Sequence, residues 1–492
     1  MTNPVFIAVD LGAGSGRVFL AEIPSSGLLL EEIHRFQYPP RPVHGILRWD
    51  IGYIFGQIES GIKVAGTRAR EIGRSVQSIG IDSWGVDYGL LDNEGFLLAD
   101  PACYRDTRTS NAMGQVFDLV PRSEIFETTG IQFQPFNTLF QLFTESDIEK
   151  TETLLLLPDL INYLLTGKKA NEYSNATTTQ MVNALTETWD ASLVTRVGIP
   201  PRILQDVVPS GTDLGPLKEE VADKLQLENV NVIAPATHDT ASAVAAAPLG
   251  EGSAYISSGT WSLIGVEQSE ALINAEVARH NFTNEGGAFG TFRFLKNVMG
   301  LWIFESCRRE WMALGLDVGY EMLIDEVSTL TTFEAFIFPD DPRFMNPPSM
   351  LQAINYQLAA TGQKIGKSPA AISKMIFDSL AFRYASVLAL IESLTGKKLA
   401  DIQIVGGGGQ NTYLNRLTAD ASGLPVFAGL TEATVVGNVL VQAIAAGRFA
   451  NLSEARQHVR ENFDLIRYDP QPSDKIAEAA SRYAVVESRF AD

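Results

Sequence analysis

Cysteine and histidine, the residues that build disulfide frameworks and many metal centres, are scarce in this sequence. Its 492 residues include two cysteines, Cys103 and Cys307, which exclude a disulfide framework and a cysteine-based zinc site. The five histidines are scattered, so the sequence indicates no metal cluster. The low cysteine content suits a reducing compartment.

Positive charge is also in short supply. The chain has 38 Lys and Arg against 58 Asp and Glu, which gives a formal net charge of −20. Such a balance argues against a nucleic-acid partner and against an anionic membrane surface. It leaves room for a local positive site that binds a phosphate group, because net charge says little about one cleft.

Long hydrophobic runs are absent as well. The longest apolar stretch, 154–165, is interrupted by Pro158 and Asp159 and is too short to span a bilayer. No basic segment precedes the apolar run that starts at Phe6, so we expect no secretory signal and a cytoplasmic location. At 45% hydrophobic and 20% charged residues, the composition is that of a globular protein with two or three domains.

A glycine-rich turn near the N-terminus joins two apolar runs. Phe6–Asp10 predicts a buried strand, and Val18–Ile23 predicts a second strand after the turn Leu11–Arg17. The pattern is neither a Walker loop nor a dinucleotide fingerprint, because both need a helix after the glycines. The tip of such a hairpin either forms an anion-binding nest or is a plain turn. The neighbouring Asp10 suggests phosphate and metal.

The next segments predict a helix, two strands and a group of polar and aromatic residues. We expect a helix over Ile51–Glu71, a strand over Val76–Asp82, and a returning strand over Ser83–Leu91 that ends in a turn at Asp92–Gly95. Aromatic faces pack on sugar C–H groups, while carboxylates and guanidinium groups bind hydroxyls. Taken together, the polar and aromatic residues of this region favour a polyol pocket. They are Trp84, Asp87, Tyr104, Arg105, Asp106, Thr107 and Arg108.

The middle of the chain, residues 110–230, is expected to be mainly helical with loops. Within it, residues 154–165 predict a buried strand or the start of a helix. The polar, β-branched stretch 176–180 predicts a loop near the ligand site.

The second half repeats the pattern of the first. Residues 254–265 again read as strand, small turn and strand, which indicates an internal duplication. We therefore expect one domain over residues 1–246 and another over 247–492, with the last helix as a candidate to pack back on the first domain. A cleft between two domains is a common ligand site.

Further elements are expected in the second domain. Four glycines in a row, Gly406–Gly409, allow a ligand to approach the backbone closely at the start of a helix. The alternative is a flexible turn. The other expected elements are helices over 368–394, 432–446 and 473–489 and a strand over 401–405.

The stretch 236–242 holds the strongest candidate for a reactive group. His238 and Asp239 follow an apolar run and precede a segment of small residues. Asp239 is either a helix N-cap or a base that takes a proton from a substrate hydroxyl. The two roles are compatible, because a helix N-terminus would hold the carboxylate ionised.

Taken in order, these motifs resemble the FGGY sugar kinases of the actin, hexokinase and Hsp70 superfamily. The resemblance covers nearly the whole chain and rests on the segments 10–17, 80–88, 104–109, 238–241, 257–262, 297–302, 406–408 and 432–434. It implies an α/β fold of two ribonuclease-H-like domains with a cleft between them. The chain departs from the usual pattern at Gly14, where relatives often have Ser, and at Glu305, where they often have Gln.

The resemblance also implies a reaction and a set of site residues. The family transfers the γ-phosphate of ATP to a sugar hydroxyl, which needs positioning, charge neutralisation and a modest base. Asp239 would be the base, Trp84, Gly85 and His238 would bind the sugar together with Asp239, and Asp10 would hold Mg²⁺. Closure of the domains would expel water. The residues implied to bind ATP are Gly12, Ala13, Gly14, Ser15, Gly16, Arg17, Gly259, Thr260, Asn297, Gly407, Gly408 and Asn411.

Within the family we expect L-rhamnulose as the sugar, phosphorylated on O1, in L-rhamnose breakdown. L-fuculose, xylulose and other ketoses are alternatives that differ only in the pocket. A protein of another class, a non-catalytic sugar-binding regulator gated by nucleotide, would keep the glycines and could lose Asp239. A glycosidase or phosphatase is disfavoured, because there is no separate carboxylate pair. We expect a monomer or homodimer that binds neither nucleic acid nor membrane.

Overall fold

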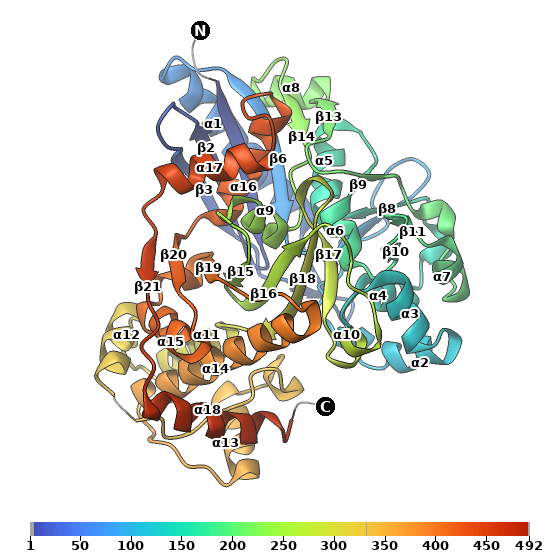
Figure 1. The fold of residues 1–492 in the computed structure, drawn as a ribbon. Coiled ribbons are helices and arrows are strands. Elements are labelled where there is room, and N and C mark those ends of the chain that lie inside the picture. Colours follow the sequence, from blue (N-terminus) through green and yellow to red (C-terminus); the bar gives the residue numbers. More distant parts are fainter. Residues whose placement is uncertain (1–3, 331, 491–492) are drawn as a thin grey trace. The chain divides into compact units, whose positions relative to one another are not determined.

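The structure is a computed structural model that describes residues 4–330 and 332–490. By its internal contacts the chain divides into two units (Figure 1). The first unit combines Met1–Pro248, Glu267–Phe294 and Ala433–Phe463, and the second combines Leu249–Val266, Leu295–Glu432 and Asp464–Asp492. Because each unit collects segments from distant parts of the sequence, the predicted division between residues 246 and 247 stays a prediction.

The first unit is built on a six-stranded sheet in the order β13-β14-β6-β1-β2-β3. β1 pairs with β2 as an antiparallel hairpin and with β6 in parallel, which confirms the hairpin and the following strand predicted from the sequence. The six strands are β1 (Val5–Gly12), β2 (Ser15–Glu22), β3 (Leu29–Gln37), β6 (Val76–Ser83), β13 (Asp213–Pro216) and β14 (Asn231–Ile233).

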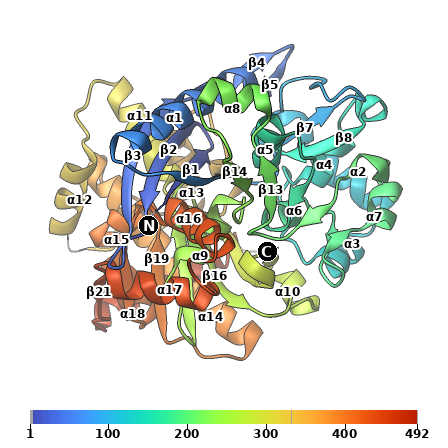
Figure 2. The same ribbon diagram turned by 90° about the horizontal axis from the view of Figure 1, so that it is seen from above.

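Helices cover both faces of this sheet (Figure 2). On one face lie α1 (Ile51–Glu71), α5 (Leu157–Thr166) and α8 (Glu219–Leu225), and on the other α9 (Asp239–Ala246) and α16 (Ala433–Ala445). Side chains alternate along a strand. Val9 and Ile81 therefore pack in the core with α1. Asp10 and Asp82, one residue further along, lie on the opposite face, where Asn438 of α16 donates to Asp82.

The predicted bounds of α1 are confirmed, and its buried Ile54, Ile58 and Ile62 show the period that predicted it. Two other local predictions were wrong. The returning strand at 83–91 is only β7 (Tyr88–Leu91), which pairs with β8 (Thr153–Leu156) in a separate two-stranded sheet. The expected loop at 176–180 lies mostly in α6 (Tyr173–Thr178).

Residues 110–230, expected to be mainly helical with loops, contain short helices and short strands joined by loops. The stretch 154–165 contains both the end of β8 and most of α5. The other helices and strands of the first unit are β4 (Arg41–Val43), β5 (Ile46–Arg48), α2 (Ala112–Leu119), α3 (Arg122–Thr129), α4 (Thr138–Phe143), β9 (Asn171–Glu172), β10 (Val182–Asn183), β11 (Thr188–Trp189), α7 (Ala191–Arg196), β12 (Val207–Val208), α10 (Ala275–Arg279), β17 (Thr283–Gly286) and α17 (Leu452–Asn462).

The second unit repeats the strand order of the first. Six strands of its seven-stranded sheet follow the order β18-β16-β15-β19-β20-β21, and again an antiparallel hairpin, β15–β16, is followed by two parallel neighbours. The hairpin β1–β2 with β6 and β14 has the same arrangement, so the internal duplication is confirmed. The strands are β15 (Ser253–Ser258), β16 (Trp261–Gln268), β18 (Phe292–Met299), β19 (Asp401–Val405), β20 (Val426–Leu430) and β21 (Ile466–Tyr468). By contacts, the end of β16 from Glu267 and the start of β18 up to Phe294 are counted with the first unit.

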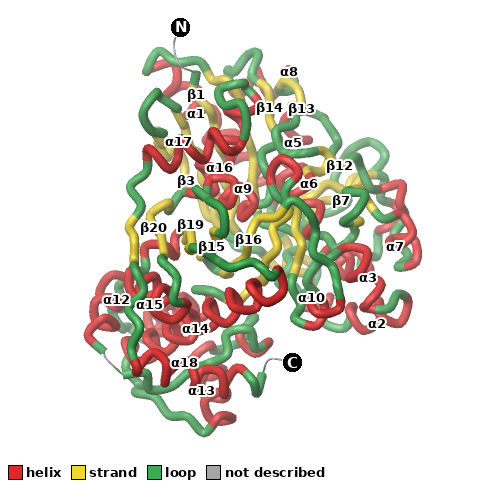
Figure 3. Tube along the Cα trace, viewed as in Figure 1, coloured by secondary structure: helices red, strands yellow, loops and turns green. Residues whose placement is uncertain are grey.

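The second unit also carries a group of helices that pack on one another (Figure 3). They are α11 (Trp302–Ala313), α12 (Tyr320–Thr329), α13 (Met350–Thr361), α14 (Pro369–Thr395), α15 (Thr412–Ser422) and α18 (Asp474–Glu487). The last helix, α18, belongs to this unit and packs on α14 and α15. In the described part of the chain, no helix combines the length and the apolar character needed to cross a membrane.

Candidate functional site

The glycine turn between β1 and β2 exposes its tip and holds its ends tightly. Gly14 has a φ of 144°, which favours glycine, and a Cβ at this position would meet nothing within 4 Å. The hydroxyl of Tyr38 donates to the carbonyl of Gly12 over 2.6 Å. Tyr38 itself was not predicted as a site residue, because nothing in the sequence links it to a turn some two dozen residues earlier.

Asp10 lies in the buried part of β1 beside two charged groups. Across the hairpin it faces Arg17, whose Nη2 donates to Oδ2 of Asp10 over 2.5 Å. In the parallel register it faces Asp82 of β6. Burial and the Asp10 carboxylate raise the pKa of Asp82 well above its usual range. Oδ1 of Asp82 is buried without a hydrogen-bond partner.

Asp82 is a residue that sequence reasoning did not include among the site residues. A signal was present, because Asp10 and Asp82 each follow a buried apolar run. The carboxyl ends of parallel strands meet at one edge of a sheet, where ligands commonly bind.

Asp239 is the first residue of α9, and His238 occupies the N-cap position. The backbone N–H of Thr240 donates to Oδ1 of Asp239 over 2.5 Å, and the side chain of Asp239 is 30% exposed. Burial, followed by the charge of Asp10, raises the pKa of Asp239 to about 7. At such a pKa the carboxyl group is partly ionised near neutral pH, and the expectation that the helix N-terminus holds it ionised stays a prediction.

The residues before α9 are fixed by one buried carboxylate, Glu172. Its Oε2 accepts from the N–H and hydroxyl of Thr237 over 2.9 and 3.0 Å. The same oxygen accepts from the N–H and hydroxyl of Ser174, and the Ser174 hydroxyl in turn accepts from the N–H of His238. Four donors on one oxygen set the position of His238 and Asp239.

The ring of His238 lies between an arginine and two carboxylates. Nδ1 is 3.0 Å from Nη2 of Arg293 and 3.7 Å from Oε2 of Glu285, while Nε2 is 3.5 Å from Oδ1 of Asp239. Burial and the charge of Arg293 lower the pKa of His238 well below its usual value. His238 is thus neutral around pH 7. Neither Arg293 nor Glu285 was predicted, since no sequence pattern links them to His238.

Part of the predicted polyol set forms a buried network around Asp87, whereas Arg105, Asp106 and Arg108 are half-buried and Thr107 is exposed. The indole N–H groups of Trp84 and Trp49 both donate to Oδ2 of Asp87, which is fully buried. A Cβ on Gly85 would lie 2.9 Å from the hydroxyl of Thr178. The carboxylate of Asp87 therefore bonds to protein groups and fixes the two indole rings. The proposed contacts of Trp84 and Gly85 with a sugar stay predictions.

In the second unit, the predicted glycine motifs converge on one another. The carbonyl of Gly259 accepts from the N–H of Leu301, and that of Thr260 accepts from Gly300 over 3.1 Å. A Cβ on Gly408 would lie 2.0 Å from the hydroxyl of Ser258, so only glycine fits there. Backbone from three loops approaches closely here, while the predicted binding of phosphate by these residues stays a prediction.

The two asparagines implied to bind ATP differ in their surroundings. Asn411 is buried and caps α15 by accepting from the N–H of Leu414 over 3.0 Å. Asn297 is half-buried on β18. Glu305, where the chain departs from the family pattern, accepts two hydrogen bonds from Arg308 at 2.8 and 2.9 Å.

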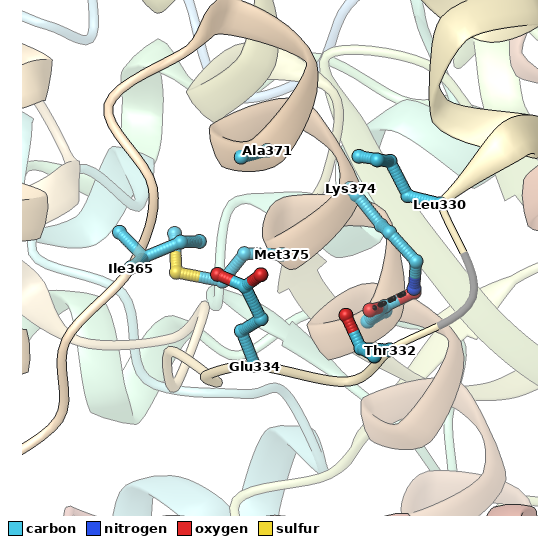
Figure 4. A pocket seen from close by; sticks show the side chains of 8 residues that line it. Leu330, Thr332, Glu334, Ile365, Ala371, Lys374 and Met375 are labelled. Carbon is cyan, nitrogen blue, oxygen red and sulfur yellow. Dashed lines mark hydrogen bonds and ion pairs between the residues drawn. The ribbon is translucent and has the colours of Figure 1, made fainter.

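A pocket in the second unit contains none of the predicted site residues (Figure 4). Its lining residues are Leu330, Thr332, Glu334, Ile365, Ala371, Lys374, Met375 and Asp378. Lys374 is the one positively charged residue in this lining, and its Nζ donates to Asp378 over 2.6 Å, which neutralises its charge. Among the described residues, no group of three or more His, Cys, Asp or Glu side chains could hold a metal ion.

Comparison with known proteins places the chain in a family. Residues 5–246 match the N-terminal domain of the FGGY family of carbohydrate kinases, and residues 254–446 match its C-terminal domain. The chain belongs to this family. It is a sugar kinase of the two-domain α/β fold that the sequence resemblance implied.

Among FGGY kinases, the chain is similar to several proteins named rhamnulokinase. One from Oceanobacillus iheyensis is 41% identical over 94% of this chain and 97% of its own length. One from Bacteroides thetaiotaomicron is 43% identical over 95% of this chain and 96% of its own length. Among solved structures, a gluconate kinase and a xylulose kinase of Lactobacillus acidophilus give TM-scores of 0.81 and 0.79 at 17% and 16% identity, and each comparison covers at least 97% of both chains. At that identity the structures bear on the fold alone.

Proposed function

We propose that this FGGY kinase transfers the γ-phosphate of ATP to O1 of L-rhamnulose and releases L-rhamnulose 1-phosphate and ADP. The observation that carries the proposal is the identity of about 40% to several proteins named rhamnulokinase, over nearly the whole length of each chain. Asp239, at the start of α9, supplies the base that a regulator without activity would not need.

Asp239 is the group that accepts the proton of the attacking hydroxyl. A new bond forms between O1 and the γ-phosphorus, the bond from that phosphorus to the bridging oxygen of ADP breaks, and the hydroxyl proton passes to Asp239. A general base works best when its pKa lies near the working pH, and that of Asp239 is about 7.

The neighbours of Asp239 hold the reacting groups in place. Glu172 fixes the backbone of Thr237 and, through Ser174, that of His238. The ring of His238 offers its Nε2 side to the sugar and to Asp239. Positioning of this kind supplies much of the rate enhancement in phosphoryl transfer.

The carboxylates of Asp10 and Asp82 fit Mg²⁺. Mg²⁺ bound with a nucleotide takes one or two carboxylates, phosphate oxygens and water, and Oδ1 of Asp82 is buried without a partner. Asp10 would hold the ion directly or through water. Bound there, Mg²⁺ neutralises charge on the transferring phosphate. The backbone of Gly12–Arg17, at the turn of the β1–β2 hairpin, would face the phosphate groups. The roles of Gly259, Thr260, Gly407 and Gly408 in binding ATP stay predictions.

A coupled assay of ADP release tests the proposal with a panel of ketoses. L-rhamnulose is expected to give the highest kcat/KM, with L-fuculose and L-xylulose slower by about fivefold or more, since one unpaired buried polar group costs about 1–3 kcal/mol. A higher kcat/KM with another ketose would show that L-rhamnulose is not the preferred substrate, while the assignment as a sugar kinase would stand. Absence of ADP release with every ketose would favour a non-catalytic binding protein.

A further inference from the structure

Arg293 is a fully buried cation in the first unit that the reaction described above does not use. It lies on β18 with an exposed fraction of 0%. Its Nε donates to the carbonyl of Gly286 over 2.9 Å, and its Nη2 lies 3.0 Å from Oε2 of Glu285 and 3.0 Å from Nδ1 of His238. A buried arginine needs such partners, because an unpaired charge is costly to bury.

The contact with His238 determines where the imidazole carries its proton. A guanidinium group has only hydrogen-bond donors, so Nδ1 of His238 must be the acceptor in this contact. A neutral imidazole with an acceptor at Nδ1 has its N–H at Nε2. That nitrogen is the one 3.5 Å from Oδ1 of Asp239.

Three other charged groups in the first unit bear on this ring. Glu285 lies 3.7 Å from Nδ1 and would favour a proton there, but Arg293 already occupies that side. Asp239 lies on the Nε2 side, where it favours the N–H. Glu172 reaches His238 only through the hydroxyl of Ser174 and the backbone. The charged groups on both sides of the ring therefore favour an acceptor at Nδ1 and an N–H at Nε2.

We propose that Arg293, oriented by Glu285, is a positioning residue that holds His238 as the Nε2–H tautomer, so that His238 donates a hydrogen bond and never acts as the base. The Nε2–H then faces the carboxylate of Asp239 and the sugar hydroxyl, and Asp239 alone takes the proton. The part that concerns the sugar rests on the proposed function. The tautomer of His238 does not, because it follows from contacts within the first unit.

The tautomer can be measured in the wild-type enzyme without any activity. The chain has five histidines, so labelling with ¹⁵N-histidine gives few ring signals, and the signals missing in His238→Asn identify those of His238. From about pH 6 to about pH 8, we expect a neutral ring with the proton on Nε2. A proton on Nδ1, or a ring that becomes charged within this range, would overturn the proposal.

The variant Arg293→Met tests whether Arg293 is what sets the tautomer of His238. Without the guanidinium, Nδ1 is free to donate to Glu285, so the ring should change to the Nδ1–H tautomer or become charged below about pH 6.5. In that case kcat/KM should acquire an acid limb near the same pH. If the ring keeps its Nε2–H and the pH profile stays that of wild type, Arg293 does not set the tautomer.

The control is Arg68→Met, which removes an exposed arginine of α1 and should leave the His238 signals unchanged. If Arg293→Met does not fold, the wild-type spectrum still decides whether the tautomer is Nε2–H. A failure of the proposed function would appear differently, as an absence of ketose phosphorylation with the tautomer as described.

Discussion

Arg17 donates to Asp10 across the β1–β2 hairpin, with Nη2 of the arginine 2.5 Å from Oδ2 of the aspartate. The carboxylate of Asp10, which is proposed to hold Mg²⁺, is thus paired with the guanidinium group of Arg17. Binding of magnesium and nucleotide would thus release Arg17 from Asp10 and leave it available to a phosphate group.

Replacing Arg17 should have opposite effects on Mg²⁺ and on ATP. In Arg17→Ala, Mg²⁺ alone should bind more tightly, because a neighbouring positive charge is gone. The KM for ATP should rise by roughly tenfold to a hundredfold, since a charge-assisted hydrogen bond contributes about 1.5–3 kcal/mol. Calorimetry and steady-state kinetics measure the two quantities, with Arg68→Ala as the control. A lower KM for ATP or weaker Mg²⁺ binding would contradict the release described here.

Glu172 should matter both for stability and for turnover. Glu172→Gln keeps the shape of the side chain but weakens four hydrogen bonds to Thr237 and Ser174, so we expect a loss of about 1–3 kcal/mol of stability. Turnover should fall with it, because His238 and Asp239 lose their support. Thermal unfolding and kcat check this, with Glu152→Gln at an exposed site as the control. A variant as stable and active as wild type would show that the loop is held by other contacts.

Two glycine-to-alanine changes in helices of the first unit should have opposite signs. A Cβ on Gly437 of α16 would lie 1.7 Å from the carbonyl oxygen of Ser242 in α9, so Gly437→Ala should cost about 1–3 kcal/mol or more by forcing the helices apart. Gly56 of α1 has nothing within 4 Å, so Gly56→Ala should stabilise by about 0.5–1 kcal/mol. Urea or thermal unfolding of both variants is the measurement, and equal effects would contradict the close packing of α9 on α16.

The neutral state of His238 predicts a dependence of stability on pH. Its pKa in the folded chain lies well below the unfolded value of about 6.5. Below that pH the unfolded chain takes up a proton that the folded chain does not, so the contribution of this histidine to stability is lost as the pH falls. In His238→Asn the melting temperature should decline less between about pH 7 and about pH 5 than in wild type.

The control for this comparison is His44→Asn, an exposed site with a φ of 50° that asparagine tolerates. That variant keeps His238 and should decline as wild type does. An equal decline in His238→Asn and wild type would mean that His238 takes up its proton normally in the folded chain.

The fold could be predicted from the sequence wherever a local pattern determines it. The spacing of Ile54, Ile58 and Ile62 gave the bounds of α1, and the repeated hairpins indicated the duplication that the two sheets share. The errors came from side-chain hydrogen bonds, both local and distant, that no residue pattern indicates. Residues 176–180 contain β-branched and polar side chains, yet the hydroxyls of Thr177 and Thr178 bond to carbonyls within α6, and Thr178 also accepts from Val86.

The same limit applies to the site. Asp10 and Asp239 were identified because each follows a buried strand. Arg293 and Glu172 were not, because they act through residues more than fifty positions away in the sequence. Near Trp84, the bonds to Asp87 and a φ of 69° at Val86 turn the chain away from β6, and no local pattern indicates such a turn.

The central claim is that Asp239 takes the proton of the attacking hydroxyl. The most direct measurement is the rate of phosphoryl transfer by Asp239→Asn with L-rhamnulose and ATP, together with the affinity of the variant for ATP, and with Asp118→Asn at an exposed site as the control. We expect turnover to fall by roughly 10² or more, the usual scale for loss of a positioned base, while ATP binds nearly as in wild type. Near-normal turnover in Asp239→Asn would contradict the assignment.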